Sequence, residues 1–120
     1  MICLNFQEAT IDLYETLKTP PDKINLGLSN YGMTFFLIEK INDTSIDINN
    51  KPAQGFGFKG PYNNVDGFMG YNELCLMLED PSWKVIKHEP SATKFAINGD
   101  RVVSFDDAET YMEKVNYFIF

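Results

Sequence analysis

The sequence has little cysteine, histidine or basic charge. Its 120 residues include two Cys, one His and ten Lys or Arg, against seventeen Asp or Glu. The single histidine, His88, has no second His or Cys at ligand spacing, so no metal site or cofactor is expected. The net charge of -7 creates a negative field that disfavours phosphate backbones, so nucleic acid is not an expected partner.

Long apolar runs are also missing. No segment approaches the ~20 apolar residues of a membrane span, and the first residues lack the basic start and apolar stretch of a signal peptide. We therefore expect no membrane contact and no signal peptide on this chain. The 44% apolar composition fits one folded domain.

The two cysteines, Cys3 and Cys75, are expected to be buried free thiols, although spacing alone leaves a bond between them open. Asn42-Asp43-Thr44 is an N-glycosylation acceptor triplet, which matters only in a secreted chain.

Apolar periodicity predicts the elements of the first half. Residues 7–18 have helical spacing that ends at Pro20-Pro21, and residues 23–29 alternate like a strand. After a turn signal at 30–32, residues 33–38 are a second extended segment. The long polar stretch 42–64 is typical of a functional or covering loop.

The second half predicts a helix over 70–79, a strand over 83–87 and two strands over 94–105 joined by a hairpin turn at Asn98-Gly99. Asp106, followed by Glu109, predicts a capping box that opens a final helix. That helix ends in the apolar run 117–120, which indicates a surface that something else covers.

Several short motifs carry a resemblance to a known family. They are Pro21-Asp22-Lys23-Ile24-Asn25-Leu26-Gly27-Leu28, Tyr31-Gly32, Gly60-Pro61-Tyr62, Gly67-Phe68, Tyr71-Asn72-Glu73-Leu74-Cys75 and Val103-Ser104-Phe105-Asp106-Asp107. In this order and spacing they resemble the C-terminal part of a family-18 glycoside hydrolase, a chitinase or chitinase-like protein. The match extends over essentially the whole chain.

The resemblance implies an α+β fold in three parts. Residues 33–105 resemble the insertion domain of chitinases, an antiparallel sheet with a short helix that forms one wall of the chitin groove. Residues 1–32 and 106–120 resemble pieces of a (β/α)8 barrel, comprising one strand and two helices. One strand cannot close a barrel.

Catalysis is not expected on this chain alone. The family hydrolyses chitin with a Glu in a D-x-x-D-x-D-x-E motif, and that spacing is absent here. The acidic groups Glu79-Asp80, Glu89 and Asp106-Asp107 fit helix ends and solvated loops. We therefore assign no catalytic residue.

Three residues are candidate sugar contacts, each with a structural alternative. Tyr31 matches the Tyr of the family's Y-G-R and could instead pack in the core. Glu73 matches the Glu of Y-Y-E-I-C and could instead be an exposed helix carboxylate. Trp83 could stack on a sugar ring, or pack internally as Trp usually does. Tyr71 matches the first Tyr of Y-Y-E-I-C, and its expected role is to pack the helix against the sheet rather than to contact a sugar.

Three departures from the family pattern weaken the sugar site. Met33 replaces the Arg of Y-G-R, Val102 replaces a Trp, and Lys94 stands where the family usually has Pro. The loss of an Arg donor and of a large aromatic side chain is expected to lower the affinity for a sugar.

The sequence therefore predicts a truncated or degenerate chitinase-like protein that binds chitin or N-acetylglucosamine oligomers weakly. The alternatives are an interaction module that uses exposed apolar faces, including self-association, and a fragment of a full-length active chitinase. The resemblance also implies an extracellular location.

Overall fold

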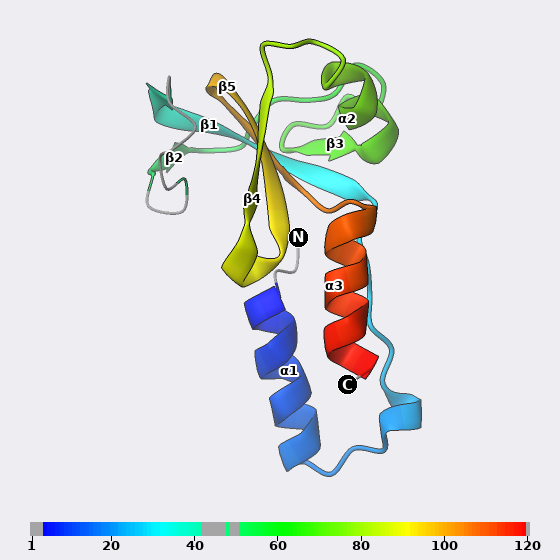
Figure 1. Cartoon of the computed structure of the whole chain (residues 1–120). Coiled ribbons are helices and arrows are strands. Elements are labelled where there is room, and N and C mark those ends of the chain that lie inside the picture. Colours follow the sequence, from blue (N-terminus) through cyan, green and yellow to red (C-terminus); the bar gives the residue numbers. More distant parts are fainter. Residues whose placement is uncertain (1–3, 42–47, 49–50, 120) are drawn as a thin grey trace.

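A five-stranded antiparallel sheet forms the centre of the computed structural model (Figure 1), which describes residues 4–41, 48 and 51–119. The strand order is β2-β1-β5-β4, and β3 also pairs with β1. The strands are β1 (Tyr31–Ile41), β2 (Ala53–Gln54), β3 (Phe68–Gly70), β4 (Lys84–His88) and β5 (Thr93–Phe105). Cys3, the triplet at 42–44 and Phe120 lie outside the described residues.

The helices divide into two groups. The short helix α2 (Tyr71–Met77) lies against the sheet, whereas α1 (Leu4–Thr16) and α3 (Ala108–Ile119) stand side by side beyond one end of it (Figure 1). Two single turns of 3-10 helix, η1 (Pro21–Lys23) and η3 (Glu89–Ser91), complete the described elements. None of the described helices is long and apolar enough to cross a membrane.

The sheet buries a separate apolar cluster on each face. Successive side chains of a strand point to opposite faces, so Val102 and Val103 of β5 enter different clusters. Leu74 of α2 joins the Val103 cluster, with Met69, Ala96 and Phe105. The Val102 cluster contains Leu37, Ile41, Ile48 and Ile97.

The hairpin predicted at Asn98-Gly99 is wrong. Residues 93–105 form one continuous strand, β5, whose first half pairs with β4 and whose second half pairs with β1. Gly99 does have the positive φ, +63°, that the pattern indicated. It lies at a register shift in the β1–β5 ladder, opposite Ile41, so its conformational freedom serves an irregularity within a strand. The true β4–β5 turn is η3, which ends at Ser91 and is followed by Ala92 as its C-cap.

The strand predicted at 23–29 is also not formed. Residues 24–30 lie between η1 and β1 without assigned secondary structure, because a strand needs a neighbour and none of the described segments pairs with them. The turn signal at 30–32 is equally misleading, since β1 already begins at Tyr31.

The helices predicted at 7–18 and 70–79 and the strand at 83–87 are present, with bounds shifted by a few residues. Cys75 is exposed, contrary to the expected burial, while its neighbour Leu74 takes the inward position on α2.

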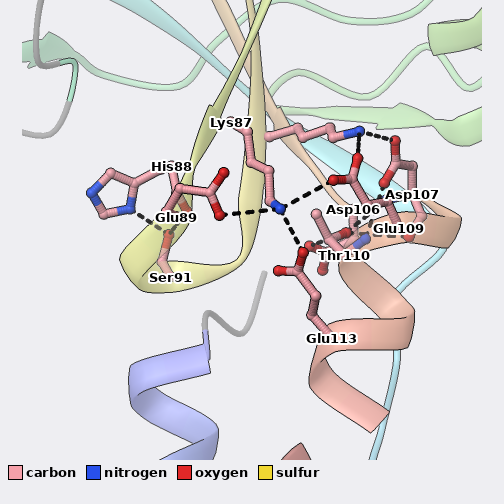
Figure 2. Close-up of polar contacts among 10 residues, drawn as sticks. Lys87, His88, Glu89, Ser91, Asp106, Asp107, Glu109, Thr110 and Glu113 are labelled. Atoms are coloured by element: carbon pink, nitrogen blue, oxygen red, sulfur yellow. Dashed lines mark hydrogen bonds and ion pairs between the residues drawn. The ribbon is translucent and has the colours of Figure 1, made fainter. Parts of the chain in front are cut away.

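The cap of α3 is Asp107, not Asp106 as predicted. Thr110 N–H donates to Asp107 Oδ1 (3.2 Å), and Asp107 N–H donates to Thr110 Oγ1 (2.9 Å), which makes a reciprocal box. Asp106 is instead buried, and its Oδ1 pairs with Lys114 Nζ at 2.6 Å. Figure 2 shows Asp106 and Thr110 together at the start of α3. The pattern identified the helix but exchanged the roles of two adjacent carboxylates.

Two lysines of the β4–β5 hairpin bind carboxylates in α3 or just before it, and Figure 2 shows Lys87 between Glu89, Glu109 and Glu113. Lys87 Nζ lies 2.5 Å from Glu113 and 3.1 Å from both Glu109 and Glu89. Lys94 Nζ lies 2.6 Å from Asp107 and 2.6 Å from Glu109. The hydrogen bonds to Glu113, Glu109 and Glu89 raise the pKa of Lys87. A network of this kind holds the direction of α3 relative to the β4–β5 hairpin more firmly than an isolated surface ion pair would.

Replacing Asp106 by Ala should destabilise the chain by about 3 kcal/mol, because it removes the buried carboxylate that pairs with the ammonium of Lys114. Denaturant unfolding at neutral pH measures the change. Glu39→Ala, at an exposed carboxylate on β1, is the control and should cost no more than about 0.5 kcal/mol. Equal costs for the two variants would contradict the assignment.

Candidate functional site

An aromatic pair lies at the start of β1, on the sheet face that α2 does not cover. Tyr31 and Met33 share this face by strand alternation, and Phe68 of β3 lies directly opposite Met33. The rings of Tyr31 and Phe68 are 5.6 Å apart and tilted by 59°. Both residues are about one-third exposed, at 38% and 37%. Such a pair presents apolar ring surface together with a tyrosine hydroxyl.

The aromatic pair continues into an apolar hollow of about 350 Å³. Phe68 belongs to the aromatic pair and also lines the hollow. Phe56 lines the hollow too, with 84% of its surface exposed. The remaining lining comes from Met33, Thr34, Phe35, Gly55 and Gly67. No titratable side chain lines the hollow, so it suits apolar groups rather than charged ones.

Glu73 is buried at the start of α2, with 2% exposure, which contradicts the exposed-helix alternative. Its Oε1 accepts from Tyr62 N–H (2.6 Å) and Asn63 N–H (2.8 Å), while Oε2 accepts from Gly70 N–H (2.7 Å). Burial would raise the pKa of this carboxyl, but the three N–H groups outweigh burial and lower it. Glu73 therefore fastens the loop at 60–63 to α2.

The close approach of this loop to Glu73 requires a glycine at position 60. A Cβ on Gly60 would stand 2.5 Å from Glu73 Oε1, closer than real Cβ contacts. The Gly60-Pro61-Tyr62 motif thus places a backbone segment directly against the carboxylate.

The structure does not bring all the predicted sugar contacts together. Trp83 is half-buried in the Val103 cluster, with its ring 6.1 Å from that of Phe58, on the sheet face opposite Tyr31. Tyr71 is 38% exposed at the start of α2. Burial and the neighbouring Cys75 raise the pKa of its hydroxyl. Among the described residues no group of His, Cys, Asp and Glu could hold a metal ion.

Comparison with known proteins identifies the family of the chain. The model of the glycosyl hydrolases family 18 matches residues 4–119. The chain belongs to this family. Over 118 residues the family-18 chain is 33% identical to probable chitinase 2 of Drosophila melanogaster, covering 88% of this chain and 22% of that relative.

Two solved structures place the family-18 chain on a common fold. The Group IV chitinase of Ostrinia furnacalis in complex with allosamidin has a TM-score of 0.80 and 33% identity, covering 90% of this chain and 28% of that one. Human YKL-39, described as a pseudo-chitinase with retained chitooligosaccharide binding properties, has a TM-score of 0.78 and 26% identity, covering 93% and 29%. The chain therefore spans less than a third of these relatives.

Phe68 and Phe56 are functional candidates that the sequence alone does not reveal. The motif Gly67-Phe68 is recognisable, but a three-residue strand gives no periodicity from which to place its side chain. Phe56 lies in a stretch without repeating pattern, where no local rule distinguishes a projecting ring from a buried one.

Glu73→Gln should flatten the fall of stability at acidic pH. Because folding lowers the pKa of the Glu73 carboxyl, this carboxyl stabilises the fold at pH values above its ordinary pKa of 4.5. The stabilisation is lost as the pH falls through the folded pKa. The variant should also lose about 1–3 kcal/mol at pH 7, because an amide oxygen replaces only one of two acceptors. Thermal unfolding between pH 3 and 7 measures both effects. An unchanged pH profile would refute the role of Glu73.

Proposed function

We propose that this family-18 chain forms one wall of a groove that weakly holds N-acetylglucosamine oligomers. In this proposal residues 33–105 correspond to the insertion domain, and residues 1–32 and 106–120 correspond to barrel pieces. An extracellular location, which the family resemblance implies, is part of the proposal.

The observation that carries the proposal is the exposed ring pair of Tyr31 and Phe68 on the uncovered face. Sugar rings have apolar faces that pack on aromatic side chains, while the tyrosine hydroxyl offers a hydrogen bond. Two structural neighbours, the chitinase in complex with allosamidin and the pseudo-chitinase with retained chitooligosaccharide binding, support a sugar ligand. Met33, in place of the family's Arg, limits the expected affinity.

Glu73 and Trp83 have different places in this proposal. Glu73 shapes the wall indirectly by holding the loop that carries Tyr62, and its sugar contact stays a prediction. A contact through Trp83 also stays a prediction, and it would need a sugar at the other sheet face.

The proposal assigns no hydrolysis to these 120 residues, because the family's D-x-x-D-x-D-x-E spacing is absent from them. The purified chain should leave a chitin oligomer intact in a turnover assay, and measurable cleavage would refute this part. The alternative is a piece of an active chitinase, which the coverage of 22% to 28% of the relatives favours. A native mass near 40 kDa, roughly the size of a complete barrel enzyme, would decide for that alternative.

Tyr31→Ala and Phe68→Ala should each weaken the binding of an N-acetylglucosamine tetramer about tenfold, which corresponds to ~1.4 kcal/mol. Titration calorimetry measures the affinity. Tyr14→Ala is a matched control, because Tyr14 has nearly the same exposure (39%) but lies on α1. Loss of binding in the control, or none in either site variant, would rule out the ring pair as the contact.

A further inference from the structure

The apolar hollow lies at a gap between two short strands that share one edge of β1. The strand β3 pairs with residues 31–33 of β1, and β2 pairs with Phe36 and Leu37. Met33 and Phe36 also pair with β5, so β2 and β3 both lie on the opposite edge from β5. Residues 34–35 of β1 have neither short strand alongside. The hollow is therefore a consequence of the sheet topology.

Two glycines with positive φ flank this gap. Gly55 follows β2 with φ +56°, and Gly67 precedes β3 with φ +87°. Other residues rarely adopt such angles. A Cβ on Gly67 would stand 3.5 Å from the ring of Phe56, so this ring lies close to the glycine backbone. The hollow thus has β1 on one side and the rings of Phe56 and Phe68 among its walls.

The lining of the hollow favours a neutral, apolar ligand. Thr34 is its one side chain with a hydroxyl, and that hydroxyl already donates to the carbonyl of Phe58. The other large lining side chains are apolar, namely Met33, Phe35, Phe56 and Phe68. A charged group would lose its hydration here without gaining an ionic partner from the lining.

The hollow is much larger than the acetyl methyl group of an ordinary chitin unit. Its volume is about 350 Å³, whereas one water molecule, similar in size to a methyl group, takes up ~30 Å³. Pockets for small molecules begin at about 300 Å³. Phe56, with 84% of its surface exposed, would lose water-exposed apolar area under a ligand. An alkyl chain of several carbon atoms fits both the size and the polarity.

We propose that the hollow binds the alkyl chain of an amphiphilic glycan whose sugar rings pack on Tyr31 and Phe68. This inference rests on the proposed sugar wall and names the class of its ligand. Phe68 belongs to the ring pair and also lines the hollow, so a chain attached to a sugar on the pair reaches the hollow directly. An apolar side chain of a second copy fits less well, because each copy carries a net charge of -7.

The test compares two glycosides of the N-acetylglucosamine tetramer by titration calorimetry, with the 120-residue chain as the receptor. One carries an octyl group and the other a methyl group, and both are used below the micelle concentration of the octyl compound. The octyl glycoside should bind about tenfold more tightly or better, since each buried CH₂ contributes about fourfold. Equal affinities would overturn the inference.

Variants of the hollow locate the effect. Phe56→Ala should lower the ratio of octyl to methyl affinity about threefold or more, because the chain then stays partly in water. Met33→Lys should bring the ratio close to one, because it places an ammonium group against the chain. Ile38→Ala is the control, since Ile38 is 63% exposed on β1 but does not line the hollow. Thermal unfolding checks that each variant is folded, and a ratio unchanged in both hollow variants would overturn the inference.

Titration with 1-octanol separates this inference from the sugar wall, because octanol has no sugar ring. It should shift the amide resonances of residues 55–56 and 67–68. Such shifts support the alkyl site even if the methyl glycoside does not bind, a result that would refute only the sugar wall. No shift at these residues would overturn the inference. So would self-association of the free chain that perturbs the same amides without any ligand.

Discussion

The pairing of β5 with both β4 and β1 is the constraint on which the rest of this structure depends. One strand of 13 residues contributes to the apolar clusters on both faces and delivers the chain directly to the start of α3. The position of β1, and with it the Tyr31–Phe68 pair, is set by its ladder with the second half of β5. A change in that register would move the candidate sugar wall as a unit.

At the end of β5 the geometry is set by charge rather than by backbone pairing. Asp106 enters the interior with Lys114, and Asp107 caps α3 while it receives Lys94. Lys94 places a cation at the point where the helix meets the sheet, within 2.6 Å of Asp107 and of Glu109. The direction of α3, and hence the geometry around residues 24–30, follows from this junction.

Local patterns predicted elements well where the chain itself supplies the partners. The helical spacing of 70–79 and the strand at 83–87 were found because both pack within the described residues. The Asn98-Gly99 hairpin failed because positive φ serves a register shift as well as a turn, and only the distant strand β1 distinguishes them. The family motifs predicted which residues form the candidate wall, but the burial of Glu73 could not be predicted without knowing which backbone N–H groups converge on it.

The position of Trp83 gives this chain a built-in optical reporter. It is the only Trp, and it packs against Phe58 within the cluster that α2 covers. Its emission therefore follows the integrity of that cluster. The ring pair of Tyr31 and Phe68 lies across the sheet, so the indole sits on one side and the candidate ligand surface on the other. The fluorescence of Trp83 therefore reports unfolding of one face of the sheet, whereas a ligand on the ring pair would occupy the other face.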